Sequence, residues 1–185
     1  MQSKLYCLIG KSGAGKDTLF QKLLAESHLT PLITYTTRPK RDHETEGMHY
    51  HFVDDATLRL FEEQGEIIEK REYNTTKGTW YYFTRIFALE KDILTISTPA
   101  GVREFIKHFG KEYVVVAHLH ADDYTRLSRL LLREYNQSHP DYIELCRRFI
   151  ADEGDFTNLD FQFININTDK PPDDCLLALK KALFV

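Results

Sequence analysis

Cysteine is scarce in this chain of 185 residues, and its three copies, Cys7, Cys146 and Cys175, are far apart in sequence. A disulfide framework or a cysteine-based zinc site needs an even set or close spacing, so the sequence predicts neither. This usage is typical of a reduced, cytosolic protein. No signal peptide precedes the first strand pattern, and we therefore expect a cytoplasmic location.

The chain also lacks a long apolar run and a large excess of one charge. No stretch approaches the roughly 18 apolar residues that suggest a membrane-spanning helix. The formal net charge of −4 argues against broad attraction to nucleic acid or to a membrane surface. We therefore expect small-molecule partners, with no nucleic acid and no membrane, and either a monomer or a homodimer.

What the chain has is a globular composition and one strong motif. Hydrophobic residues make up 42% and charged residues 28%, which is enough for one domain with a substantial core. Leu5–Ile9 predicts a buried strand, and a helix pattern starts after Lys16. The loop between them matches G-x-x-x-x-G-K, whose backbone N–H groups and lysine bind phosphates. Its candidate phosphate-binding residues are Gly10, Ser12, Gly13, Ala14, Gly15 and Lys16.

The residue after Lys16 departs from this motif. A serine or threonine that binds magnesium is usual there, whereas this chain has Asp17 followed by Thr18. An acidic residue in the first turn suits the helix dipole, so Asp17 is explained equally well as a helix-start residue. Alternatively Asp17 holds a magnesium-bound water and Thr18 supplies a hydroxyl, and the sequence leaves both interpretations open.

A second cluster of polar and basic residues runs from Thr34 to Arg41. Arg38 and Arg41, close together on a proline-containing loop, suit bidentate binding of a phosphate. Taken alone, solvated loop arginines are the more common explanation. The pattern around this cluster predicts a small β-rich lobe. Its expected elements are strands at 32–36, 49–53, 66–73 and 80–84, a helix from Asp54 or Asp55 to Gln64, and a turn at Lys77 and Gly78.

After this lobe, strands and helices alternate, and each strand is nearly continuous in apolar residues. That rhythm predicts a three-layer α/β fold with a mainly parallel sheet covered on both faces. The expected helices are 85–91, 99–109, 121–134, 141–153 and one that follows Pro171 and Pro172, and the expected strands are 93–98, 113–119 and 161–166.

The predicted helix 121–134 carries three arginines at helical spacing. Arg126, Arg129 and Arg133 share one face, and we expect leucines 127, 130 and 131 to form an opposing apolar stripe. Without further context, a solvated helical face explains such arginines.

Taken together, these segments resemble the guanylate kinase family of P-loop nucleoside monophosphate kinases. GKSGAGKDTL resembles the family's phosphate loop, and TYTTRPKRDHETEGMHYHFV resembles its monophosphate-binding segment without a gap. The family's lid entry and exit resemble 129–133 and Arg147–Arg148, and its late D-x-x-x-x-N strand resembles Asp160–Asn165. The resemblance implies one domain with a core (1–33, 85–132 and 149–185), a monophosphate-binding lobe (34–84) and a helical lid (133–148).

The resemblance also implies the reaction and the residues that perform it. The γ-phosphoryl group of ATP moves to GMP or dGMP with Mg²⁺, which is chiefly positioning and charge neutralisation. Arg38, Arg41, Tyr50 and Tyr82 bind the acceptor phosphate, while Thr34, Glu69 and Thr84 contact its base. The implied catalytic residues are Lys16, Arg38, Arg129, Arg133 and Arg148 (or Arg147), with Asn165 as a candidate contact to the donor adenine.

Further departures keep two other functions open. Thr98-Pro99-Ala100-Gly101 replaces the family's acidic D-x-Q-G, and about four extra residues lie around 75–79. A P-loop kinase for another small phosphorylated acceptor is therefore one alternative. A non-catalytic guanylate-kinase-like binding module is the other, although such modules typically lose the phosphate loop that this chain retains.

Overall fold

The core of the molecule is a parallel sheet, as the alternation of strands and helices in the sequence predicts. The structure is a computed structural model that describes residues 2–41, 44–75 and 78–184. Within them, five strands lie in the order β2-β7-β1-β8-β9, and every pairing is parallel. Their bounds are β1 Leu5–Ile9, β2 Thr30–Pro31, β7 Ile93–Ile96, β8 Val114–His120 and β9 Ile164–Asn167.

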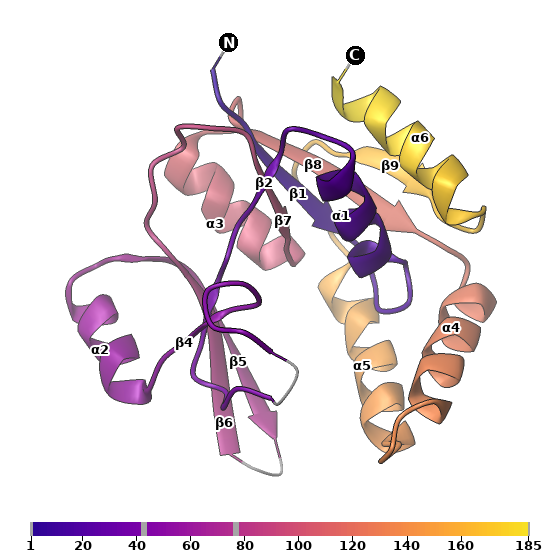
Figure 1. Cartoon of the computed structure of the whole chain (residues 1–185), viewed down its shortest axis with the longest axis horizontal. Helices are drawn as coiled ribbons and strands as arrows, with labels where there is room; N and C mark the ends of the chain where they lie inside the picture. Colours follow the sequence, from indigo (N-terminus) through magenta and orange to yellow (C-terminus); the bar gives the residue numbers. More distant parts are fainter. Residues whose placement is uncertain (1, 42–43, 76–77, 185) are drawn as a thin grey trace.

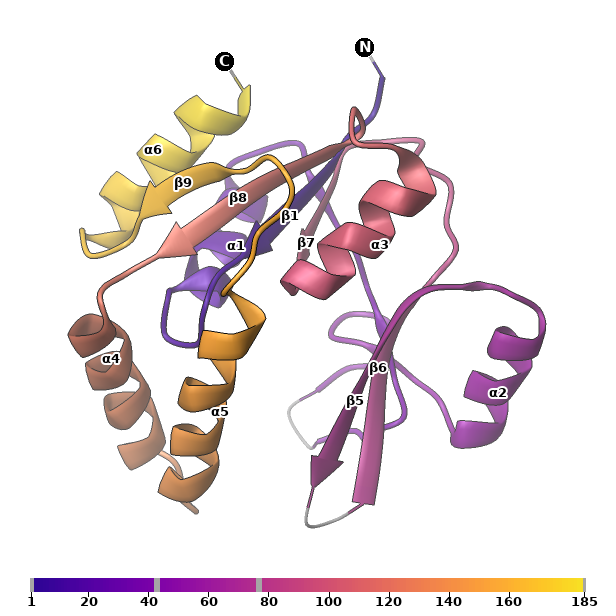
Figure 2. The ribbon, with the colours of Figure 1, turned by 180° about the vertical axis from the view of Figure 1, so that it is seen from behind.

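Helices cover both faces of this sheet (Figures 1 and 2). Helices α1 (Lys16–Ala25) and α6 (Pro172–Phe184) lie on one face, and α3 (Pro99–Phe109) lies on the other. Successive residues of β1 alternate between the two layers: Leu8 packs with Leu19 and Leu179, whereas Cys7 and Ile9 belong to the cluster beneath α3. This alternation follows from the two-residue repeat of a strand and explains why β1 is apolar throughout.

A second, smaller sheet forms the other lobe, with the order β4-β3-β6-β5. Its strands are β3 Tyr35–Thr36, β4 His51–Phe52, β5 Ile67–Thr75 and β6 Gly78–Arg85, and helix α2 (Asp55–Glu63) lies beside them (Figure 1). Asp54 caps α2 through the backbone N–H of Thr57 at 2.8 Å, and Gly65, at φ +67°, follows its end. The predicted turn residue Lys77 lies outside the described residues.

Helices α4 (Asp123–Tyr135) and α5 (Tyr142–Asp155) form an antiparallel hairpin that extends from the core on the same side as the second sheet (Figure 1). Both chain ends lie at the opposite end of the molecule. None of the helices in the described part of the chain is long and apolar enough to cross a membrane.

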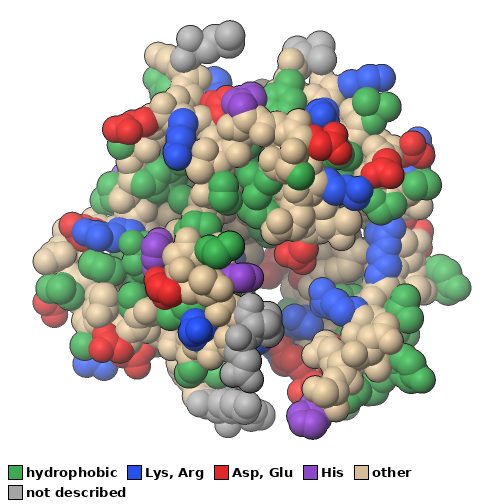
Figure 3. Space-filling model, in the orientation of Figure 1, with side chains coloured by type: hydrophobic (Ala, Val, Ile, Leu, Met, Phe, Trp, Pro, Cys, Tyr) green, Lys and Arg blue, Asp and Glu red, His purple; other side chains and the backbone are tan. Residues whose placement is uncertain are grey.

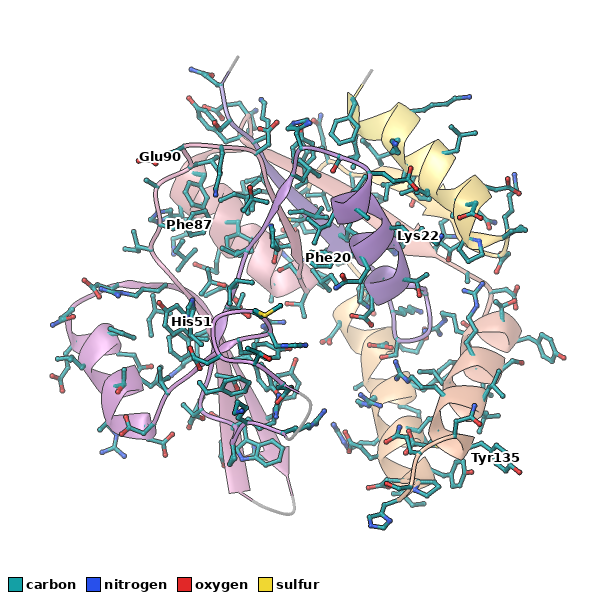
Figure 4. The ribbon with its side chains drawn as sticks, viewed as in Figure 1. Phe20, Lys22, His51, Phe87, Glu90 and Tyr135 are labelled. Carbon is teal, nitrogen blue, oxygen red and sulfur yellow. The ribbon has the colours of Figure 1, made fainter. Side chains whose placement is uncertain are left out.

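Two predicted elements are wrong. The expected strand 32–36 forms only at Tyr35–Thr36 (β3), and the preceding strand β2 ends at Pro31, because the chain leaves the core sheet here. The Leu32 N–H still bonds to the Leu94 carbonyl of β7, while the Thr34 carbonyl accepts from the His51 N–H of the second sheet. The expected helix 85–91 does not form. Arg85 still pairs in β6, and beyond it Phe87 (labelled in Figure 4) and Leu89 pack into the α3 cluster as irregular chain. The ring centroids of Phe87 and Phe109 are 5.0 Å apart.

The predicted apolar stripe of α4 is also wrong. Arg126 is buried at 1% exposure, whereas Leu131 is 43% exposed. The buried side of α4 repeats every four residues through Arg126, Leu130 and Glu134. An arginine is tolerated there because carboxylates and an aromatic ring surround its guanidinium, which neutralises and packs the buried charge.

Candidate functional site

The glycine loop lies between β1 and α1, at the carboxyl end of the parallel strands, where ligands bind in open α/β sheets. Gly13 adopts φ +81° and Gly15, the residue before α1, adopts φ +83°, a region that side chains disfavour. A Cβ at Gly13 would also meet the Arg126 carbonyl oxygen at 2.6 Å. The glycine at position 13 is therefore required both by the turn and by the close approach of α4.

Gly13→Ala is expected to weaken ATP binding and to lower the free energy of unfolding by about 1–3 kcal/mol, because left-handed backbone strain adds to the clash with α4. Gly154→Ala is the matched control. It lies within α5 with nothing near its added Cβ, so we expect a gain of about 0.5–1 kcal/mol. Urea denaturation and ATP titration measure both effects. Equal stability of the two variants would contradict the assigned strain.

Lys16 is held inside the loop. Its Nζ donates to the Gly10 carbonyl at 2.6 Å and to the Lys11 carbonyl at 3.2 Å. Burial lowers the pKa of Lys16, and the carboxylates of Asp17 and Asp152 oppose that shift. These contacts place a cation at the loop, where incoming phosphate oxygens can replace the two carbonyl acceptors.

A cavity of about 660 Å³ opens beside this loop and brings the predicted donor-site residues together. Arginines from both α4 and α5 line it. Arg129 is fixed by hydrogen bonds to the Gly13 carbonyl at 3.3 Å and to the Thr168 carbonyl at 2.7 Å. The cavity can therefore neutralise a polyphosphate from several sides. Its lining residues are Ser12, Gly13, Gly15, Lys16, Asp17, Thr18, Arg129, Leu130, Arg133 and Arg148.

The donor set in this cavity fits a magnesium ion carried by a nucleotide. Asp17 and Thr18 offer a carboxylate and a hydroxyl beside the phosphate loop. Mg²⁺ prefers oxygen ligands and is usually held by one or two protein groups together with phosphate oxygens and waters. Among the described residues no cluster of three or more His, Cys, Asp or Glu side chains forms a metal site. The fit therefore concerns a metal–nucleotide complex rather than a protein cage.

Helix α5 is tied to the glycine loop by acidic residues that sequence reasoning missed. Asp152 accepts from the Ser12 backbone N–H at 2.6 Å, and Glu153 pairs with Lys11 at 2.6 Å. Arg126 lies 3.3 Å from Glu153 and 3.8 Å from Asp152. Helix α5 is thus linked to the loop and to α4 by a charge network in which each of these pairs joins residues about 25 or more apart in sequence, so no local pattern reveals it.

A smaller cavity of about 110 Å³ lies on the other side of Thr18, toward α6. Thr168, Lys170, Pro172 and Cys175 line it together with Gly15, Thr18, Leu19 and Arg129. Asn165 lines neither this cavity nor the larger one; its Oδ1 lies 3.1 Å from Nδ1 of His118. The structure therefore does not bring the proposed adenine contact to the loop.

On the acceptor side, Arg38 is buried and its guanidinium is already occupied. It forms a bidentate pair with Glu44 at 2.6 and 3.0 Å and donates to the Tyr82 hydroxyl at 2.9 Å. Tyr82 in turn meets the ring of Tyr50 at 5.5 Å. The predicted phosphate residues Arg38, Tyr50 and Tyr82 are thus assembled. The Arg41 side chain is exposed, and its backbone N–H donates to Glu44 at 2.8 Å.

The Arg38–Glu44 pair predicts a pH-dependent stability. Hydrogen bonds from Arg38 lower the pKa of Glu44 from 4.5 to about 2. The carboxylate therefore stabilises the fold above about pH 4.5, and this contribution is lost as the pH falls toward 2. In that window Glu44→Gln is expected to flatten the dependence of unfolding free energy on pH by up to about 1.4 kcal/mol per pH unit. Urea denaturation from pH 5 to pH 3 measures it. The exposed Glu63→Gln is the control, and identical slopes for both variants would refute the coupling.

Glu69 and Thr84 also meet, across β5 and β6. The Thr84 hydroxyl donates to Glu69 Oε1 at 2.8 Å, and both residues are buried. Thr34, the third predicted base contact, is half-buried at the start of β3, and its carbonyl accepts from His51. Arg71, which sequence reasoning did not assign, pairs with Glu69 at 3.1 Å.

A further cavity of about 500 Å³ lies between β5 of the small lobe and the C-terminal end of α5. It is lined by Arg71 and Tyr73 of β5, by the N-terminus of α3 and by the end of α5. Because α5 also supplies Arg148 to the cavity at the glycine loop, the two cavities border the same helix. The space-filling view shows a hollow between the two halves of the molecule, with Lys and Arg side chains along its lid side (Figure 3).

A parallel sheet with a glycine loop at the end of β1, arginines from a helical hairpin and a small β-lobe define the class of P-loop nucleoside monophosphate kinases. The guanylate kinase family matches residues 2–123. A guanylate kinase of Paraburkholderia xenovorans is 30% identical over 196 residues, covering 97% of this chain and 81% of that protein. One from Chelativorans sp. is 30% identical over 168 residues, covering 88% and 74%. The chain belongs to the guanylate kinase family.

The fold agrees with that assignment. The crystal structure of guanylate kinase from Anaplasma phagocytophilum aligns with a TM-score of 0.63 over 98% of this chain and 85% of that one. At 18% sequence identity this likeness concerns the fold alone. It extends beyond residue 123, so the helical hairpin and the closing β9 and α6 share the same architecture.

Proposed function

We propose that this chain transfers the γ-phosphoryl group of ATP to GMP or dGMP, giving ADP and GDP or dGDP. The observation that carries the proposal is the buried Glu69 carboxylate, whose Oε2 lacks a hydrogen-bond partner. Guanine offers a ring N–H and an exocyclic amine to such an acceptor, whereas adenine has no such donor pair. Leaving a buried acceptor unpaired costs about 1–3 kcal/mol, which supports selection of guanine.

ATP binds at the glycine loop in this proposal. The backbone amides between Gly10 and Lys16 hold the phosphates, and Lys16 reaches the transferring group. Arg129, Arg133 and Arg148 neutralise the charge that develops there. Asp17 and Thr18 would hold Mg²⁺, directly or through water, and the metal would supply further charge neutralisation. The acceptor phosphate is already an anion, so no general base is needed.

The acceptor phosphate binds at Arg38, Arg41, Tyr50 and Tyr82. For Arg38 this requires a phosphate to compete with Glu44, and the exchange replaces one charge-assisted bidentate pair with another of the same kind. The base is placed between Glu69, Thr84 and Thr34. In this proposal both nucleotides border α5, and their phosphates face each other across the hollow between the lobe and the core.

We propose the predicted division of the chain into a monophosphate-binding lobe at 34–84, a lid at 133–148 and a core made of the remaining segments. The second sheet supports this division because its strands fall within residues 35–85. Closure of the lobe and the lid over both nucleotides would exclude water from the transferring phosphoryl group.

The experiment that tests the proposal is a coupled assay of ADP release against GMP, dGMP, IMP, AMP, CMP and UMP, with and without Mg²⁺. GMP or dGMP is expected to give the highest kcat/KM. A preference for a non-purine acceptor would favour a kinase of another specificity. Binding of GMP without ADP release would favour the non-catalytic module.

A further inference from the structure

Two buried side-chain atoms among the described residues lack a hydrogen-bond partner, Glu69 Oε2 and Arg71 Nε. They lie 3.1 Å apart as an ion pair, and the Arg71 Nη2 donates to the other carboxylate oxygen, Glu69 Oε1, at 3.3 Å. Buried polar groups are nearly always satisfied in native proteins, so an adjacent unsatisfied donor and acceptor need an explanation. A ligand that donates to Glu69 Oε2 and accepts from Arg71 Nε would satisfy both atoms.

Arg71 lies between two polar neighbours, Glu69 on its own strand and Tyr82 on the adjacent strand. It shares a strand face with Glu69, two residues earlier on β5, and is registered directly opposite Tyr82 on β6. The Glu69 side chain is only 3% exposed, whereas that of Arg71 is 23% exposed and lines the 500 Å³ cavity. Arg71 therefore lines the cavity, whereas the Glu69 carboxylate beside it does not.

Across the strand pair, Arg71 neighbours residues of the proposed phosphate site. Tyr82 accepts from Arg38 and meets Tyr50 ring to ring. Burial raises the pKa of Tyr50, and the guanidinium groups of Arg38 and Arg71 oppose this rise, so both cations act on the same hydroxyl. Arg71 is thus between the base acceptor Glu69 and the tyrosines of the phosphate site.

We propose that Arg71 is an additional phosphate-binding residue of the acceptor site, held by Glu69 until guanine displaces it. The inference rests on the proposed function. The N–H groups of guanine bond to Glu69 in place of Arg71, and the released guanidinium donates to the acceptor phosphate. Adenine lacks that donor pair and leaves Arg71 on Glu69. Recognition of the base is therefore coupled to affinity for the phosphate.

The test compares GMP with guanosine, because their difference in Kd isolates the contribution of the phosphate. Calorimetric titrations use the wild type, Arg71→Gln and the control Lys70→Gln. Lys70 is the next residue on β5, carries the same charge and pairs with Glu62 on α2. The preference for GMP over guanosine is expected to fall about 10- to 100-fold in Arg71→Gln and to stay unchanged in Lys70→Gln.

Arg71→Gln leaves the Glu69 carboxylate buried without a cation, which can unfold the protein. The double variant Glu69→Gln, Arg71→Gln removes both charges and keeps the shape of the pair, so it is measured alongside, with thermal melting as the folding control. It is expected to show the same loss of phosphate preference.

An unchanged preference for GMP over guanosine in the folded variants would overturn the proposal, and would assign Arg71 to Glu69 alone. Wild-type protein that binds neither GMP nor dGMP would overturn both this inference and the proposed function. Wild-type binding of GMP with an unaltered preference in the variants overturns only the inference.

Discussion

Lys16→Ala is expected to lower kcat by about 10²- to 10³-fold, the usual cost of removing one donor that stabilises transition-state charge. Lys16 lies in the loop cavity with Asp17, Thr18 and the lid arginines, away from the residues assigned to the acceptor. The Kd of GMP should therefore stay within about twofold of the wild-type value, since the change removes an interaction made at the transferring group.

Steady-state kinetics and a GMP titration measure these two effects separately. Lys22→Ala is the matched control, because Lys22 is on the same helix but is exposed and pairs with Asp173 at the surface (Figure 4). Wild-type turnover in Lys16→Ala would refute the assignment of the glycine loop as the donor site.

Glu69→Gln should have the second large effect, a loss of base selection. The amide keeps the size of the side chain but replaces one acceptor oxygen with a donor, so it cannot accept both guanine N–H groups. We expect the ratio of kcat/KM for GMP to that for AMP to fall about 10- to 100-fold. The fall should come chiefly from GMP, because AMP makes no comparable bond to the carboxylate.

The acceptor panel measures this ratio directly. Glu104→Gln removes a carboxylate from α3 whose partner, Lys107, is on the same helix, and it should leave the ratio unchanged. An intact preference for GMP in folded Glu69→Gln would reject the role of Glu69 in reading the base. Loss of activity toward all acceptors alike would assign Glu69 to the stability of the lobe.

The elements with strong local signals could be predicted from the sequence. The strand Leu5–Ile9 and the helix Pro99–Phe109 have the predicted bounds, and the sheet is parallel with helices on both faces. Segment 85–91 was mistaken for a helix because four of its seven residues, at positions 86–89, are apolar, and so short a run does not distinguish a helix from irregular chain. Its irregular form depends on Phe87 and Leu89, which pack into a distant cluster under α3.

In the candidate site, too, some features follow from local sequence and others only from tertiary structure. The sequence by itself determined the glycine loop, because each of its requirements is local: left-handed backbone at Gly13 and Gly15, a lysine at the helix start and a buried strand before it. It also determined that Arg38 and Arg41 belong to one loop, since only two residues lie between them.

Only the tertiary structure decided which distant groups meet. The burial of Arg126, the hydrogen bond from the Ser12 N–H to Asp152 and the bond from Thr84 to Glu69 across β5 and β6 depend on helix packing and strand register. A charged side chain has the same local pattern whether water or a buried partner neutralises it. The difference arises from desolvation, which exists only after remote segments have packed together.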